Sequence, residues 1–260
     1  MRLHLAPLAF AILAAAPAAG AQTKADSLPA AKDIVSRYVA AIGGRDAILK
    51  KKSMRSTGTF EMPAAGLKGD LTLVQANPDR MAMRINIPGL GEIQSGYDGT
   101  VGWSVNPMQG ARVLEGKELA AMREDAGLRS ILREGEGRKL ETVGKSEMGG
   151  EPCWQVKVTY ASERSVTECY SVASGLLVGT TATQESPMGV VQVTTLVSDY
   201  KDFGGLKIPT SARMQMMGQE QKMTIAAVEY DGAEDAKAFD RPAAVTTIIE
   251  QKAKAGTTTP

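Results

Sequence analysis

The sequence predicts a mainly β (α+β) fold, an antiparallel sheet of about eleven strands with one helix before it and short helices interrupting it. Three observations predict this class. Most of the chain after Ser53 alternates apolar and polar residues with a period of two. Turn-forming residues separate these runs at short intervals. Two stretches, 28–44 and 115–138, follow helical spacing instead.

The first 21 residues are typical of a secretory signal peptide. Arg2 supplies a positive charge, Leu5–Ala16 is an apolar stretch too short to span a bilayer, and Ala19–Ala21 forms a small-residue cleavage site. No Cys lies at this point, so we expect no lipid anchor. We therefore expect a soluble protein exported to the periplasm.

The stretch 28–44, LPAAKDIVSRYVAAIGG, predicts an amphipathic helix. Pro29 suits its first turn, and Gly43-Gly44 suits its C-terminal stop. Its apolar face is formed by Ile34, Val35, Tyr38, Val39 and Ile42.

The clearest strand is RMAMRINI, residues 80–87, which places Met81, Met83, Ile85 and Ile87 on one face. The runs WQVKVTY, VVQVTTLV and KMTIAAVEY behave similarly. So many antiparallel strands predict a sheet that curls strongly or partly closes.

The helical stretch 115–138 interrupts the strands, with apolar residues set among charges and Gly127 and Gly135 dividing it. A Thr-, Lys- and Ala-containing end predicts a flexible tail over 243–260. Residues 22–242 are then expected to form a single domain.

Two cysteines, Cys153 and Cys169, each lie eight residues from Ala161 in CWQVKVTYASERSVTEC. If Ala161 is near a hairpin tip, the two cysteines face each other across antiparallel strands, at a distance that a disulfide spans. An oxidising compartment favours this pairing. Two buried free thiols are the alternative.

Composition excludes several function classes. The only histidine is His4, inside the expected signal peptide, which argues against a Ser-His-Asp triad and the common zinc sites. Without that segment the chain has 29 basic and 29 acidic side chains, so nothing suggests a nucleic-acid partner. No P-loop, dinucleotide fingerprint or GxSxG is present. We expect no metal, no cofactor and no enzymatic activity.

Methionine is unusually frequent, 13 residues against 4 Phe. Flexible, polarisable thioethers line surfaces that accept variable apolar shapes, although ordinary core packing also explains them. A concave sheet lined by Met and Ile would suit an acyl chain.

The segment GYDGTVGWSVNPMQGARVL, residues 96–114, resembles a strand-turn-strand motif of the LolA family of periplasmic lipoprotein carriers. The matching residues of the "DG…W…NP" pattern are Asp98, Gly99, Trp103, Asn106 and Pro107. ANPDRMAMRI resembles the family's "RP..F" strand through Pro78 and Met81. Ala82 stands where the carrier has an Arg that helps to keep its lid closed, and Arg84 lies two residues on.

The C-terminal half resembles a broader set of LolA-like, outer-membrane lipoprotein-sorting proteins. The motifs that carry this resemblance are SGLL (174–177), YKDFGGLKIP (200–209) and FDRP (239–242). YKDFGGLKIP also predicts a hairpin turn in which Gly204 or Gly205 takes a positive φ.

The resemblance implies an incomplete barrel with helices as a lid over its concave face, and non-covalent binding of acyl chains of a lipid or lipoprotein. We expect the cavity to be lined by Met81, Met83, Ile85, Ile87, Trp103, Trp154, Val156 and Val158. We expect the lid to contribute Leu119, Met122, Leu128 and Ile131.

Two other function classes stay open. A LolA-shaped sensor or interaction module would bind an envelope protein instead of a lipid. A hydrolase would need a carboxylate pair such as Glu134 with Glu136, or Asp199 with Asp202, and the lack of histidine makes it the least favoured.

Overall fold

The computed structural model describes residues 28–133, 137–186 and 189–256. The expected signal peptide, 1–21, lies outside the described residues. The helices are α1 (Ala31–Ala41), α2 (Arg45–Lys50), η1 (Pro63–Ala65), α3 (Gly116–Asp125), η2 (Leu128–Leu132), η3 (Ala233–Phe239) and α4 (Ala243–Gly256). The η elements are 3₁₀ helices.

The strands form one antiparallel sheet in the order β6-β5-β4-β3-β2-β1-β13-β12-β11-β10-β9-β8-β7. Their bounds are β1 (Ser53–Met62), β2 (Leu67–Ala76), β3 (Arg80–Ile87), β4 (Gly91–Tyr97), β5 (Gly102–Asn106), β6 (Gly110–Val113), β7 (Lys139–Met148), β8 (Glu151–Thr159), β9 (Ser165–Ser171), β10 (Leu177–Ser186), β11 (Gly189–Phe203), β12 (Leu206–Met216) and β13 (Gln219–Tyr230).

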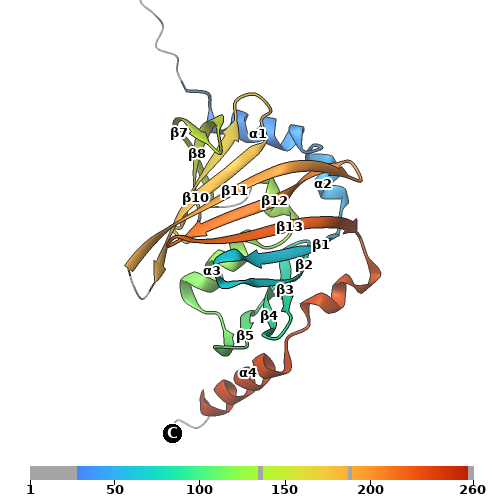
Figure 1. Ribbon diagram of the computed structural model, residues 1–260. Helices are drawn as coiled ribbons and strands as arrows, with labels where there is room; N and C mark the ends of the chain where they lie inside the picture. Colours follow the sequence, from blue (N-terminus) through green and yellow to red (C-terminus); the bar gives the residue numbers. More distant parts are fainter. Residues whose placement is uncertain (1–27, 134–136, 187–188, 257–260) are drawn as a thin grey trace, which may run out of the picture.

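The sheet is strongly curved and stays open, with β6 and β7 as its two edges (Figure 1). The predicted fold class is thus confirmed, with thirteen strands in the described residues where about eleven were expected. The chain between the two edges carries α3 and η2. Figure 1 shows α3 inside the curve of the sheet.

Register separates the two faces of the sheet. Val74 pairs with Ala82, and both pack with Phe239 of η3 on what we call the outer face. Leu71 pairs with Ile85, and each lies an odd number of residues along its strand from Val74 or Ala82. Both therefore point to the opposite face, which we call the inner face. Helices α1, α2, η2 and α3 lie on the inner side.

The C-terminal segment corrects one prediction. A flexible tail was expected over 243–260, but Ala243–Gly256 forms helix α4. Val245 is fully buried, and Lys252 Nζ donates to Glu115 Oε1 at 2.5 Å. Just before the helix, Arg241 Nε donates to Asp98 Oδ2 at 2.5 Å. Two segments singled out in the sequence, 98–99 and 239–242, therefore contact each other.

The YKDFGGLKIP segment forms a hairpin turn, and the C-terminal end of α1 packs against it. Gly204 and Gly205 both have positive φ, 59° and 86°, as a two-residue type I′ turn requires. The Lys207 N–H donates to the Ile42 carbonyl at 2.9 Å. A Cβ at Gly43 would lie 2.3 Å from the Gly205 carbonyl oxygen, so this close approach needs glycine.

Within the described ranges, no helix is long and apolar enough to cross a membrane.

Candidate functional site

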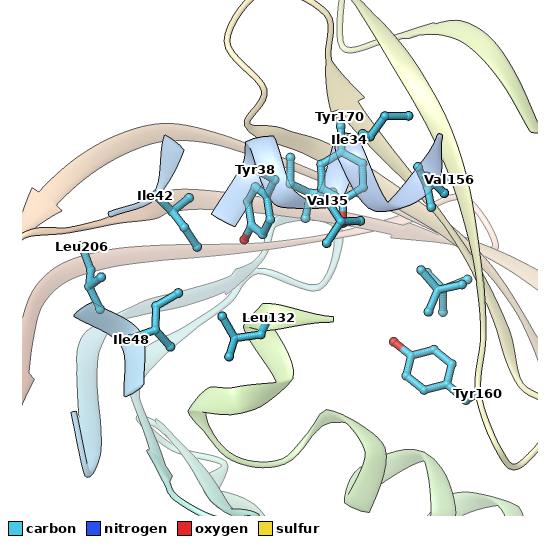
Figure 2. Close-up of a cluster of buried hydrophobic side chains, with 14 residues drawn as sticks. Ile34, Val35, Tyr38, Ile42, Ile48, Leu132, Val156, Tyr160, Tyr170 and Leu206 are labelled. Atoms are coloured by element: carbon cyan, nitrogen blue, oxygen red, sulfur yellow. The ribbon is translucent and has the colours of Figure 1, made fainter. Parts of the chain in front are cut away.

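The inner face carries two hydrophobic clusters. The first, which we call the helix-capped cluster, fills the side of β8–β10 and β12 beneath α1, α2 and η2 (Figure 2). Tyr38 and Tyr170 pack with ring centroids 5.3 Å apart. Its buried members are Ala31, Ile34, Val35, Tyr38, Ile42, Ile48, Leu132, Val156, Val158, Tyr160, Val166, Tyr170, Leu177 and Leu206.

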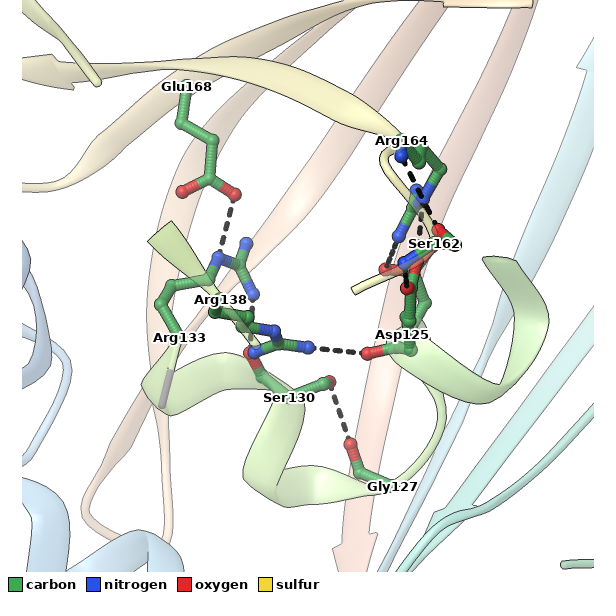
Figure 3. Close-up of polar contacts among 9 residues, drawn as sticks. Asp125, Gly127, Ser130, Arg133, Arg138, Ser162, Arg164 and Glu168 are labelled. Carbon is green, nitrogen blue, oxygen red and sulfur yellow. Dashed lines mark hydrogen bonds and ion pairs between the residues drawn. The ribbon is translucent and has the colours of Figure 1, made fainter. Parts of the chain in front are cut away.

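A buried ion pair fastens η2 to this half of the sheet. Arg133, directly after η2, donates from Nε to Glu168 Oε1 of β9 at 2.7 Å (Figure 3). The Glu168 side chain is 2% exposed, and the Tyr170 hydroxyl donates to its other oxygen. Burial and the Glu168 charge raise the pKa of Tyr170 well above its ordinary value. Arg133 therefore stays charged and paired, and Tyr170 stays a hydrogen-bond donor.

A second group of polar contacts joins the end of α3 to the β8–β9 hairpin. Arg164 donates to Glu124 at 3.1 Å and to Asp125 at 2.7 Å. The Ser162 N–H donates to Glu124 Oε1 at 3.1 Å. The guanidinium of Arg164 also lies 4.0 Å from the centre of the Tyr160 ring. These contacts, partly visible in Figure 3, hold the end of α3 against the β8–β9 hairpin.

The second inner cluster, which we call the methionine-rich patch, differs in kind. Its buried members are Phe60, Leu71, Ile85 and Ile87. Half-buried residues pack against them: Met62, Leu67, Met83, Leu90, Ile93, Met223 and Ile225. Among the described residues, all of these come from β1–β4, β13 and the β3–β4 turn, and none comes from a helix.

The eight residues predicted to line one cavity fall into separate groups. Met83, Ile85 and Ile87 belong to the methionine-rich patch, and Met81 is half-buried on the same face of β3. Val156 and Val158 are fully buried in the helix-capped cluster, with Trp154 packed against it. These three lie beneath helices rather than beside Met83.

Trp103 lies on the outer face, away from the other seven. It pairs with Gly96, which pairs in turn with Ala82. A Cβ at Gly96 would lie 2.4 Å from the Trp103 ring, so the ring covers this glycine. Trp103 is therefore an anchor of the outer face and does not line the inner one.

The four predicted lid residues lie on α3 and η2. Leu119 contacts Gly102 of β5, where an added Cβ would lie 2.8 Å from its Cδ1, and Met122 is half-buried on the same helix. Leu128 is 1% exposed, and Ile131 packs against the helix-capped cluster. Ile131 therefore belongs to the capped half of the inner face, whereas Leu128 is buried outside both inner clusters.

Cys153 and Cys169 form a disulfide, with a Cα–Cα distance of 5.4 Å. The bond lies with Val178 and Met148 in a small cluster of its own. The two cysteines are not directly opposed, since Cys153 pairs with Ser171 and Cys169 with Gln155. The hairpin is centred one residue later than expected, so the disulfide joins diagonal positions.

The carboxylates considered for catalysis have local structural contacts where they are described. Asp202 Oδ1 accepts the Gly205 N–H at 3.0 Å, and Asp199 Oδ2 accepts the Ser198 hydroxyl at 3.0 Å. Glu134 and Glu136 lie outside the described residues. In the described part of the chain, no three His, Cys, Asp or Glu side chains group as metal ligands.

Two open depressions are lined largely by polar residues. One, of about 340 Å³, lies between η3 and β1–β4, where Arg55, Arg84 and Lys237 line it together with Asp70 and Glu92. The other, of about 300 Å³, lies at the tip of the β12–β13 hairpin.

Sequence reasoning missed the Arg133–Glu168 pair. Glu168 lies two residues from both Val166 and Tyr170 on the same strand, so all three point to the same face. This position already implied an inward carboxylate. Its partner could not be found in this way, because Arg133 reaches it from a separate segment, 35 residues away in sequence.

No family model matches the chain, and no curated protein matches it. Solved structures do. A DUF1329 family protein from Desulfovibrio piger superposes with a TM-score of 0.56 at 13% identity, over 82% of this chain and 98% of that one. A LolA superfamily protein from Nitrosomonas europaea gives 0.54 at 12% identity, over 82% and 99%. A putative outer membrane lipoprotein-sorting protein domain from Vibrio parahaemolyticus gives 0.51 at 9% identity, over 80% and 96%.

At these identities the likeness concerns the fold alone. The matches extend over nearly the full length of the solved chains and most of this one. The open curved sheet with helices inside its curve, which the motifs predicted, is thus a LolA-like fold.

Proposed function

We propose that this protein is a non-enzymatic carrier or chaperone of the periplasm that binds acyl chains of lipids or lipoproteins. The acyl chain would lie on the methionine-rich patch of the inner face. This placement narrows the predicted cavity to Met81, Met83, Ile85 and Ile87, and leaves out Trp154, Val156 and Val158, which are packed beneath helices.

The observation that carries the proposal is the half-buried state of the patch. Met62, Met83, Met223 and their apolar neighbours are packed on one side by the sheet and have no helix among their cluster partners in the described chain. Thioether side chains change rotamer at little cost, so such a surface accepts chains of different shape. A contiguous, partly exposed apolar surface on a curved sheet suits a long apolar ligand.

Two further points support the location. The disulfide is of the kind that persists in oxidising compartments such as the periplasm. The N-terminal segment has the charge and apolar pattern of an export signal.

The first experiment is native mass spectrometry of the protein purified from the periplasm, followed by lipid extraction and titration with a fluorescent fatty acid. A co-purifying acylated species that the fatty acid displaces is the expected result. A clean apo mass without fatty-acid uptake would contradict acyl binding and favour the protein-interaction module.

The substitution Met83→Glu tests the location of the site. A carboxylate on the patch should weaken fatty-acid binding at least about tenfold, because an acyl chain would have to desolvate it. Folding should survive, since Met83 is only half-buried. Met108→Glu is the matched control, because Met108 is 80% exposed in the β5–β6 turn. Equal binding by both variants would place the ligand elsewhere, and if Met83→Glu fails to fold, Met83→Gln replaces it.

A further inference from the structure

The depression of about 340 Å³ between η3 and β1–β4 lies on the outer face of the sheet and has a charged lining. We call it the outer-face depression. Its floor includes Val74 and Ala82, which pack with Phe239 of η3, so η3 stands at one end of it. Its charged residues are Arg55, Arg84, Lys237, Asp70 and Glu92.

Register separates these charges by sign. Asp70 pairs with Asn86, and Asn86 pairs with Glu92, so three oxygen-bearing side chains form one row across β2, β3 and β4. Arg84 lies two residues before Asn86 on the same face, about 6.8 Å along the strand. Arg55 lies further in that direction, since it pairs with a β2 residue four positions after Asp70. The carboxylates therefore lie at the end away from η3, and the guanidinium groups lie toward η3.

Arg55 is held in place from one side only. Its Nε donates to Asp235 Oδ1 of η3 at 3.0 Å, and the Asp235 side chain is 5% exposed. The Ser53 hydroxyl donates to the other oxygen of Asp235 at 2.5 Å. Within the described residues the two terminal amino groups of Arg55 make no contact, so they can donate to a ligand in the depression.

The other charges of the depression are not neutralised by one another. In the part of the chain that the structure describes, Arg84 and Asp70 have neither an ion pair nor a hydrogen bond from their side chains. Glu92 accepts only the neutral amide of Gln94, at 2.5 Å. Arg84 is a diagonal cross-strand neighbour of both carboxylates and within reach of them, yet it pairs with neither. The depression thus keeps a positive and a negative end.

We propose that the outer-face depression binds phosphoethanolamine, as a free ester or as the headgroup of a phospholipid. Arg55 and Arg84 take the phosphate, because guanidinium groups form charge-assisted hydrogen bonds with phosphate oxygens. The ammonium lies at the row of Asp70, Asn86 and Glu92, whose oxygens accept its three N–H donors.

The spacing of the two ends favours this ligand class over an α-amino acid. In phosphoethanolamine the opposite charges stand at the two ends of a two-carbon chain, whereas an α-amino acid carries both on one carbon. Two rows about 6.8 Å apart suit the longer separation. Lys237 adds a positive charge at the phosphate end.

Isothermal titration calorimetry of the whole protein with O-phosphoethanolamine tests the site. One saturable site is expected. Inorganic phosphate and ethanolamine should each bind at least about tenfold more weakly, because each fills one end only. Phosphocholine should also bind more weakly, since its quaternary ammonium donates no hydrogen bond. Absence of saturable binding, or equally tight binding of inorganic phosphate, would overturn the proposal.

Substitutions at the two ends locate the ligand. Arg84→Gln should weaken phosphoethanolamine binding at least about tenfold and reduce its preference over ethanolamine. Asp70→Asn should reduce its preference over inorganic phosphate. Both side chains are exposed, so both variants should fold. The matched control is Arg213→Gln, an exposed position on β12. Unchanged affinity in Arg84→Gln, or an equal loss in the control, would contradict the site.

Vesicle flotation distinguishes the two sources of the ligand. The probes are phosphatidylcholine vesicles with and without phosphatidylethanolamine. Flotation that requires phosphatidylethanolamine and is lost in Arg84→Gln would identify the lipid headgroup. Calorimetric binding without flotation would identify a free ester. Flotation that Arg84→Gln leaves unchanged would count against a headgroup site in the depression.

This inference does not depend on acyl binding, because the depression and the methionine-rich patch lie on opposite faces of the sheet. Arg84→Gln should therefore take up fluorescent fatty acid with the wild-type affinity. Met83→Glu should in turn keep its affinity for phosphoethanolamine. Failure of either site is thus measured separately from failure of the other.

Discussion

The two halves of the inner face belong to one continuous sheet, yet one half is covered by helices and the other is only half-buried. The helix-capped cluster packs Val, Ile and Tyr side chains beneath α1, α2 and η2, and a buried ion pair fastens it. The methionine-rich patch has Met, Ile and Leu side chains supplied by strands and a turn. The difference teaches that the covering helices, rather than the strand pattern, decide which inward face becomes core.

Residue type follows this difference. Beneath the helices, branched and aromatic side chains with few rotamers fill a fixed shape, as close packing requires. On the patch, three of the seven half-buried residues are Met. A flexible side chain is useful where the opposing surface changes and less useful where it is fixed.

The largest expected effect on stability comes from removing the buried Arg133–Glu168 ion pair of the helix-capped half. Glu168→Ala leaves Arg133 partly buried without its partner and should lower the free energy of unfolding by about 3–5 kcal/mol. Urea denaturation measures the loss. Glu141→Ala, an exposed change on β7, should stay within about 0.5 kcal/mol of wild type. If the two variants were equally stable, the pair would not fasten η2.

The disulfide of the same half gives the next effect. Cys153→Ser/Cys169→Ser opens a loop with a sequence separation of 16 and should cost about 3 kcal/mol. Reducing the wild-type protein should give the same loss in denaturation, whereas reductant should leave the double variant unchanged. A wild-type protein indifferent to reductant would contradict this role.

A smaller effect is expected from Asp98, in the turn after β4. Its Oδ1 accepts the N–H groups of Thr100 and Val101, and its Oδ2 accepts Arg241. Burial acts to raise the pKa of Asp98, but the hydrogen bonds from Arg241, Val101 and Thr100 outweigh it and hold the pKa below its ordinary value. Asp98→Asn keeps the turn acceptor but removes the negative charge that pairs with Arg241, and should cost about 1 kcal/mol.

The direction of the Asp98 pKa shift determines how the stability difference between the wild type and Asp98→Asn depends on pH. A depressed folded-state pKa contributes stability that is present above the unfolded value of about 4 and lost as pH falls through the folded value. The wild type and Asp98→Asn should therefore differ at neutral pH and converge in thermal melts once the pH falls below the lowered pKa of Asp98. A difference that persists in acid would assign the effect to the turn instead of the charge.

Much of the fold could be predicted from local patterns. The amphipathic helix over 28–44, the alternation of Met81 to Ile87 and the Gly204-Gly205 turn all appear as expected. The strand count was less certain from sequence, because a strand as short as the edge strand β6, with four residues, shows little alternation. Helix α4 was missed because its stability comes from contacts such as buried Val245, which the local composition does not reveal.

The candidate site was predicted only in part. The strand faces of Met83, Ile85, Val156 and Val158 follow from alternation, and all four are inward. The prediction placed Trp103 on the wrong face of the sheet. The turn after β4 determines that Trp103 pairs with Gly96 and so shares its face, and alternation within one strand carries no information about the register of the next.

The sequence by itself determined the period of each segment, the positions that need positive φ and the order of motifs, since these depend on neighbouring residues. Only the tertiary structure decided that Glu168 meets Arg133, that the cysteines bridge diagonally and that α1, α2 and η2 cover one half of the inner face. The physical reason is that such contacts join segments far apart in sequence. The curvature of the sheet and the path of the interrupting helices determine these contacts. Curvature and path depend in turn on the free energy of the whole chain.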